Sequence, residues 1–342
     1  MDRASTARGV TSGVDAGVAT PGPGGGLGLN ERAWRLADAL AARHAELRVA
    51  VHALATGARV IDAGIAAPGG VGAGLALAEL CMGGLGHVAV VPVPLGGGLT
   101  LPGLQVWTDH PAESCMASQY AGWAVQVGDF FAMGSGPLRA HARVERELFE
   151  KLGYAERADR GVLVLEGRTL PTPEVAAWLG EKAGLDPSRL TLAVAPTAST
   201  AGGVQVVARV LETGLHKMEV LGFDVTRVRS GTGTAPLPPV AKNDLRAIGR
   251  TNDCILYGAR AHYLVDAPDE ELEPLAARMP SEASADYGTP FYETFKRYGG
   301  DFYKIDRLLF SPAEVWLTSA TSGRTFRGGS VNVEVLRGSL FE

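Results

Sequence analysis

Cysteine is scarce in this chain. The 342 residues contain only Cys81, Cys115 and Cys254, which are far apart and show no C-x-x-C spacing. The seven histidines are scattered, and none belongs to an i,i+4 pair beside a helical glutamate. Disulfide frameworks and metal centres need such groupings, so the sequence predicts buried thiols in a reducing compartment, the cytoplasm, and no bound metal.

Excess positive charge and uninterrupted apolar runs are missing as well. The net charge is -5, whereas a general nucleic-acid binder would be basic. The longest apolar stretch, residues 71–95, is broken up by Glu79, His87 and several glycines and prolines. We therefore expect no nucleic-acid partner, no membrane partner and no secretory signal.

Common nucleotide-binding and hydrolase motifs are also absent, namely G-x-x-x-x-G-K-[ST], a strand-linked G-x-G-x-x-G, and G-x-S-x-G. Their absence argues against a phosphate-binding loop and against a nucleophile elbow. Asp109, His110 and Ser114 have the residue types of a hydrolase triad, but the sequence neighbours 109 and 110 project in different directions. The sequence therefore predicts no serine hydrolase.

Glycine, in contrast, is abundant: 45 residues, or about 13% of the chain against a usual ~7%. Many of these glycines lie inside apolar segments, which indicates close backbone packing and ligand-facing loops. The length suits two domains, and alternating strand and helix patterns predict the α/β class. We expect a flexible tail (1–28), a first α/β domain (29–170) and a second (171–342), with the C-terminal segment able to pack back on the first.

Two helix starts can be placed from local signals. Asn30 stands where an N-cap is expected, before the apolar periodicity of a first helix. Pro137 suits the first position of another helix after the turn M-G-S-G that contains Ser135. Arg139 falls in the first turn of that helix, where free backbone N–H groups attract anions. A purely structural turn is the alternative at this second site.

The most informative stretch is 190–214, LTLAVAPTASTAGGVQVVARVLETG. The apolar run 190–195 predicts a buried strand, and a small polar loop leads to a helix from about Val204. Arg209 and Glu212, three residues apart, share one face of that helix. Open α/β sheets build their sites at the carboxyl ends of strands, so we expect both residues to be catalytic. A surface ion pair is the alternative with equal weight.

A weak internal echo of this stretch occurs earlier in the chain. When residues 69–70 are aligned with residues 202–203, both Gly-Gly, Glu79 falls opposite Glu212. Both segments then read as strand, small-residue loop, helix with a glutamate, and strand. The echo nominates Glu79 as a second carboxylate facing the first across a cleft, with a chance match as the alternative.

Several long blocks of the sequence closely resemble methenyltetrahydromethanopterin cyclohydrolase, over roughly residues 29–338. This resemblance implies two α/β domains with the pterin in a cleft between them, usually a homotrimer, and no metal or organic cofactor. It implies reversible hydrolysis of 5,10-methenyl-tetrahydromethanopterin, or of a related bacterial methanopterin, to the 5-formyl derivative. The blocks are TDHPAESCMASQYAGW, FFAMGSGPLRA, APTASTAGGVQVVARVLETGLHKMEVLGFD, SGTGTAPLPPVA, GRTNDCILYG, DYGTPFYETFKRY and DFYKID.

The resemblance also assigns roles to residues. The family motif A-R-x-x-E-T-G stands here at residues 208–214. It makes Glu212 the base that accepts a proton from water, and Arg209 the group that orients Glu212 and keeps it ionised. On the internal echo alone, and not on the resemblance, we expect Glu79 to stabilise the methenyl cation, and we nominate Arg139 for the pterin tail. Small-residue loops would let the backbone approach the pterin, and from them we nominate Ser135, Thr197, Ser199 and Thr232.

One position departs from the family pattern. Archaeal members read ASQKAGW where this chain has ASQYAGW, so that Tyr120 replaces a lysine. This change puts a role for an ammonium group in doubt and fits a substrate variant, such as the related pterin that methylotrophic bacteria use in one-carbon metabolism. The competing hypothesis is a non-catalytic pterin- or nucleotide-binding α/β protein.

Overall fold

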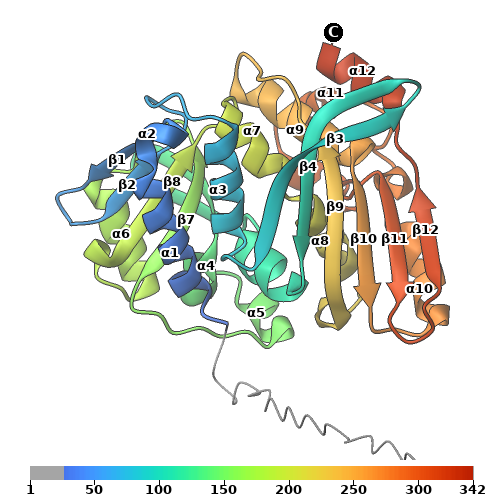
Figure 1. Ribbon diagram of the computed structural model, residues 1–342, viewed down its shortest axis with the longest axis horizontal. Coiled ribbons are helices and arrows are strands. Elements are labelled where there is room, and N and C mark those ends of the chain that lie inside the picture. The colour runs from blue at the N-terminus through green and yellow to red at the C-terminus, as the bar shows by residue number, and fades with distance from the viewer. Residues whose placement is uncertain (1–26, 342) are drawn as a thin grey trace, which may run out of the picture.

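The computed structural model describes residues 27–341, so the predicted tail lies outside the described residues except for its last two. The α/β class is confirmed: the chain forms two six-stranded mixed sheets, called sheet A and sheet B here, with helices packed around them. The two sheets stand side by side in Figure 1, and β3 and β4 lie at the near edge of sheet B.

Sheet A has the strand order β1-β2-β8-β7-β6-β5. Its three central strands, β2, β8 and β7, are parallel, and the outer strands pair antiparallel. All six residues of β8 are buried, as expected for a parallel strand covered on both faces. The strands are β1 (Ala50–Ala53), β2 (Arg59–Asp62), β5 (Trp123–Val127), β6 (Phe130–Ser135), β7 (Gly161–Gly167) and β8 (Leu190–Ala195).

Sheet B has the order β12-β11-β10-β9-β4-β3 and is antiparallel except between β10 and β11. Buried and less buried residues alternate along β10, which is typical of a sheet covered on one face. The strands are β3 (Gly86–Gly96), β4 (Leu99–Thr108), β9 (Val228–Pro236), β10 (Arg260–Val265), β11 (Glu314–Ser319) and β12 (Thr325–Gly329).

Helices fill the faces of sheet A and one face of sheet B (Figure 1). The α-helices are α1 (Leu29–Ala42), α2 (His44–Leu47), α3 (Val71–Cys81), α4 (Pro137–Ala142), α5 (Arg146–Leu152), α6 (Pro173–Ala183), α7 (Thr200–Val207), α8 (Val210–Val220), α9 (Asp244–Gly258), α10 (Asp269–Arg278), α11 (Phe291–Arg297) and α12 (Val333–Phe341). Within residues 27–341 there are also one π-helix, η1 (Ala112–Gln119), and five short 3-10 turns: η2 (Pro187–Arg189), η3 (Val225–Arg227), η4 (Ser281–Ala283), η5 (Phe302–Lys304) and η6 (Arg307–Leu309).

The chain passes repeatedly between the two sheets. The hairpin β3–β4 comes from the first half of the sequence but belongs to sheet B, whereas β8 comes from the second half and belongs to sheet A. Strands on both sides of residue 170 therefore contribute to each sheet. The domain boundary predicted at residue 170 stays a prediction, and it does not separate the strands of sheet A from those of sheet B.

The predicted N-cap at Asn30 is wrong. Helix α1 begins at Leu29 after Gly28, and Asn30 lies inside the helix, fully buried. Its amide nitrogen donates to the carbonyl of Pro137 (2.9 Å), and its Oδ1 accepts from the backbone N–H of Val162 (3.1 Å). The side chain thus joins α1 to α4 and β7 instead of closing its own helix.

Asp62, the last residue of β2, organises the loop that follows it. The side chain is fully buried, and its two oxygens accept the backbone N–H groups of Gly64, Ile65, Ala66 and Ala67 at 2.7–3.0 Å. Burial alone would raise the pKa of this carboxyl, but the four N–H groups outweigh that effect and hold the pKa below its ordinary value. The loop at the carboxyl end of β2 is therefore fixed by one ionised side chain.

We expect Asp62→Asn to lower the free energy of unfolding by about 2 kcal/mol at pH 7, because charged acceptors of backbone N–H groups are lost. The folded pKa lies below the unfolded one, so Asp62 stabilises the fold above the unfolded pKa, and this contribution is lost as pH falls through the folded pKa. Urea denaturation at several pH values measures the difference. The exposed turn residue Asp129 provides the control, Asp129→Asn, and equal stabilities of the two variants would contradict the role of Asp62.

Candidate active site

The candidate site is built around a break between helices α7 and α8. Helix α7 begins at Thr200, four residues earlier than predicted, because the Ser199 hydroxyl oxygen accepts the N–H of Gly202 (3.0 Å) and caps it. The helix ends at Val207, and α8 begins at Val210. Arg209 therefore stands at the junction instead of in the middle of one helix.

Arg209 is only 8% exposed, and its guanidinium is held from three sides. Nη1 donates to the backbone carbonyl of Gln119, while Nη2 donates to Ser135 Oγ (3.0 Å) and Gln205 Oε1 (3.1 Å). Within the described chain it forms no ion pair with Glu212, which is also buried. The surface ion pair, the alternative considered from the sequence, is therefore excluded.

Glu212 lies in the first turn of α8 and is 6% exposed. Burial raises the pKa of its carboxyl to about 7, against the opposing positive charges of Arg209 and Arg139. A carboxyl group with this pKa takes up and releases a proton near neutral pH, which is the requirement for general acid–base catalysis. Helix α8 also packs closely against β10 two residues after Glu212. A Cβ on Gly214 would lie 2.0 Å from the Tyr263 hydroxyl, so only glycine lets α8 approach β10 here.

The π-helix η1 supplies the opposite wall. The π-helix is a form found frequently at functional sites. It ends at Gln119, whose carbonyl holds Arg209, and at Tyr120, whose ring stacks on His216 with centroids 5.4 Å apart. Burial, followed by the negative charges of Glu212 and Glu145, raises the pKa of Tyr120. Tyr120 therefore belongs to the same site as Glu212.

Arg139 lies in the first turn of α4, as predicted, and its side chain is fully buried. Its guanidinium forms an ion pair with Glu145 and donates to the carbonyl of Met116. The Tyr120 and Phe149 rings lie on it, with centroids 5.3 and 5.2 Å from Cζ. The structure thus places a second positive charge near Glu212, inside the protein.

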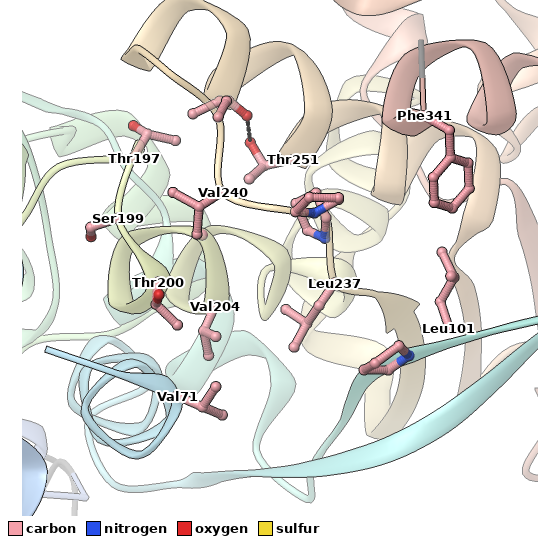
Figure 2. Close-up of a pocket in the computed structure, with 16 residues that line it drawn as sticks. Val71, Leu101, Thr197, Ser199, Thr200, Val204, Leu237, Val240, Thr251 and Phe341 are labelled. Carbon is pink, nitrogen blue, oxygen red and sulfur yellow. Dashed lines mark hydrogen bonds between the residues drawn. The ribbon is translucent and has the colours of Figure 1, made fainter.

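Thr197 and Ser199 line a pocket of about 330 Å³ at the other end of α7. Eight residues of helix separate this end from Arg209, a length of about 12 Å. Figure 2 shows the two residues on one side of the pocket, with Val240 and Leu237 between them and Phe341. The Thr197 hydroxyl donates to Glu166, and the Ser199 hydroxyl donates to the carbonyl of Pro196 (2.8 Å). The pocket is largely apolar, with the hydroxyl residues Thr197, Ser199 and Thr200 on one side, while the hydroxyl of Thr251 donates to the carbonyl of Ala247.

The remaining two nominated residues lie apart from these groups. Glu79, on α3, accepts the backbone N–H of Val88 (3.2 Å) and lies 3.9 Å from His87 Nδ1, so its carboxylate is engaged with β3. Burial raises its pKa against both of these neighbours. Thr232 is exposed on β9. The residues on either side of it face α8, so Thr232 points to the opposite, uncovered face of sheet B.

Four further residues belong to the cluster and were missed from the sequence. Gln205 and His216 stand four residues before Arg209 and four after Glu212, so the helical period could have identified both. Gln119 and Arg307 are about 90 residues from their partners in sequence, and no local pattern indicates them. Arg307 Nη2 lies 3.4 Å from His216 Nε2.

All three cysteines are free and buried, as predicted. Among the described residues, no three or more histidine, cysteine, aspartate or glutamate side chains are grouped closely enough to hold a metal ion. None of the helices between residues 27 and 341 has the length and apolar character to cross a membrane.

The model of the family described as "Cyclohydrolase (MCH)" matches residues 28–340. Methenyltetrahydromethanopterin cyclohydrolase of Methanococcoides burtonii is 41% identical over 91% of this chain and 97% of its own length. The proteins of the same name from Rhodopirellula baltica and Methanocaldococcus jannaschii are 50% and 42% identical, over 83% and 92% of this chain and 86% and 98% of their own lengths. With a family match over nearly its whole length, the chain belongs to the cyclohydrolase family (MCH).

Proposed function

We propose that this protein catalyses the reversible hydrolysis of 5,10-methenyl-tetrahydromethanopterin, or a related bacterial methanopterin, to the 5-formyl derivative in one-carbon metabolism. Relatives that carry this activity in their name align with most of the chain. The structural observation that carries the proposal is the buried Glu212, whose pKa of about 7 suits proton transfer from water.

For this reaction the protein must supply a base, because the substrate is already a strong electrophile. The methenyl carbon is bonded to two nitrogens that share its positive charge, so water can attack without a Lewis acid. As the new C–O bond forms, ionised Glu212 accepts one proton of the water. The neutral intermediate then collapses: the C–N bond breaks, Glu212 returns its proton to the departing nitrogen, and the hydroxyl proton leaves to solvent. The formyl group stays on the other nitrogen.

Arg209 and Arg139 act on this step through their charge. Both guanidinium groups are fixed by other partners, Arg209 by Gln119 and Ser135, and Arg139 by Glu145. Their positive charges counter the effect of burial on the Glu212 pKa, so a useful fraction of the carboxyl group is ionised at neutral pH. Because both groups are held by protein, neither needs to approach the cationic carbon, which would repel them.

The other nominated contacts remain predictions. In our proposal Tyr120 forms a wall of the catalytic site, and Ser135 positions Arg209. Thr197 and Ser199 bind a remote part of the substrate in the pocket that they line. The proposed roles of Glu79 at the methenyl cation, Arg139 at the pterin tail and Thr232 at the pterin have no support from the positions of these residues.

We also propose that the protein is a homotrimer in the cytoplasm. The three buried free thiols suit a reducing compartment. The trimer rests on the family resemblance alone.

Replacing Glu212 with glutamine should lower kcat for methenyl-pterin hydrolysis by roughly 10²- to 10⁴-fold, because the base is lost while the shape is kept. The decay of methenyl-pterin absorbance measures the rate. The matched control is Glu219→Gln on the same helix, a glutamate that pairs with Lys151 at the surface, and it should leave kcat unchanged. A fast Glu212→Gln enzyme would contradict the mechanism, and a wild-type protein that binds the pterin without turnover would support the non-catalytic binder.

The pH profile of kcat/KM should fall on the acid side with a midpoint near 7, where Glu212 becomes protonated. Arg209→Met removes a charge that lowers the Glu212 pKa, so the midpoint should move to higher pH. The exposed Arg146 on α5 offers the control, Arg146→Met, which should leave the midpoint in place. A midpoint that moves to lower pH in Arg209→Met would show that a different group titrates.

Light scattering on purified protein should give three times the 35.7 kDa mass of one chain. A mass of one or two chains at the enzyme concentration used in the assay would rule out the trimer.

A further inference from the structure

We infer that Arg307, together with His216 and Tyr120, forms an anion-binding subsite next to Glu212. This subsite binds a phosphate or carboxylate group of the substrate, located at a distance from the methenyl carbon. The inference rests on the proposed function and specifies which part of the substrate this chain recognises.

Arg307 lies beyond Glu212 on the same side of α8, next to His216. Glu212 and His216 are four residues apart on α8, so their side chains are neighbours on one helix face, with Cβ atoms about 6 Å apart. The His216 ring stacks on Tyr120, and its Nε2 lies 3.4 Å from Arg307 Nη2. A ligand that reaches Glu212 past Tyr120 and His216 therefore has Arg307 within reach of its far end.

Arg307 differs from the other two arginines of the site in what it contacts. The guanidinium groups of Arg209 and Arg139 are buried and occupied by carbonyl, hydroxyl or carboxylate oxygens. Arg307 is exposed, and within residues 27–341 the one hydrogen-bond partner of its guanidinium is the imidazole of His216. Burial, with the Arg307 charge adding to it, lowers the pKa of that imidazole. An imidazole carries no negative charge in either protonation state, so His216 does not offset the charge of Arg307. Such a guanidinium presents a fork of N–H donors that matches phosphate and carboxylate oxygens.

The segment that carries Arg307 is fixed in place although the side chain is exposed. Lys217, the residue after His216, is fully buried, and its Nζ donates to the carbonyls of Leu308 and Pro280. On the other side, the Asp306 carboxylate accepts the N–H of Leu308 (3.0 Å) and the hydroxyl of Ser284 (2.7 Å). Burying an ammonium group is costly, and here it holds the Arg307 segment against α8. A binding group fixed in advance loses less entropy when it takes up its ligand.

Arg307 should affect binding and leave the chemical step alone. Its charge acts on His216 and Tyr120, whereas the charges that act on the Glu212 pKa are those of Arg209 and Arg139. An interaction made equally in the ground state and in the transition state changes KM and not kcat. The subsite therefore has a kinetic signature that a structural role would not produce.

The test compares wild type with Arg307→Ala and Arg307→Lys on two methenyl substrates, one complete and one that ends before its first phosphate or carboxylate group. For the complete substrate, Arg307→Ala should raise KM roughly tenfold or more while kcat stays within about twofold, since a charge-assisted hydrogen bond is lost. Arg307→Lys should recover part of the loss. For the truncated substrate, wild type and Arg307→Ala should have the same KM. Arg324→Ala, at the turn between β11 and β12 where Arg324 pairs with Asp269, is the control and should match wild type.

Inhibition by inorganic phosphate tests whether the subsite binds an anion that is not attached to the substrate. It should compete with the complete substrate in wild type, and it should compete less in Arg307→Ala. Equal inhibition of the two proteins, or an unchanged KM of Arg307→Ala for the complete substrate, would overturn the subsite while wild-type turnover keeps the proposed function. A matching loss of rate on the truncated substrate would also overturn it. Absence of hydrolysis by the wild-type protein would instead remove the proposed function.

Discussion

The burial of one carboxyl group, Glu212, is the constraint on which the site depends. In a poorly solvated position the ionised form is unfavourable, and the group would stay protonated unless positive charge were placed near it. Two arginines supply that charge, and each must itself be buried and satisfied. Carbonyl oxygens, Ser135, Gln205 and Glu145 meet most of that need, while Arg139 Nε has no hydrogen-bond partner among the described residues. Glu212, the two arginines and the groups that bind the arginines thus form one unit. The buried carboxyl group needs the arginines, and the buried arginines need their oxygen partners.

The fold explains how such a unit can be assembled. The break between α7 and α8 turns Arg209 towards η1 and β6, while Glu212 stays on α8 against sheet B. The end of η1 brings Tyr120 and the carbonyl of Gln119 to the same place, and the 3-10 turn η6 brings Arg307. The site therefore draws on elements of both sheets, which is consistent with an elongated substrate bound along the junction.

The sequence alone predicted the α/β class and the strand at 190–195, which the structure confirms, because apolar runs are local signals. It also nominated Arg209 and Glu212 as catalytic from a local family motif, and that nomination stays a prediction. It failed where the deciding contacts are distant. Asn30 has the residue type of a cap, but its partners lie 107 and 132 residues away. Arg139 was placed at an anion-binding helix start, but its guanidinium pairs with Glu145 and lies against the ring of Phe149. Glu79 was nominated from a similarity between two segments of the sequence. Such a similarity does not indicate which strand the side chain contacts.

The exchange of strands between the two sheets has a consequence for how the chain is made. The hairpin β3–β4 is synthesised early, yet β4 finds its second neighbour only when β9 follows, more than a hundred residues later. Until then the hairpin presents an unpaired edge, the kind of surface on which strands from other chains pair. Sheet A likewise cannot form completely until β8 is synthesised, because β8 lies between β2 and β7 and pairs with both. On the ribosome, most of the polypeptide must therefore emerge before either sheet can close, and a nascent chain stalled near its middle would be a client for chaperones.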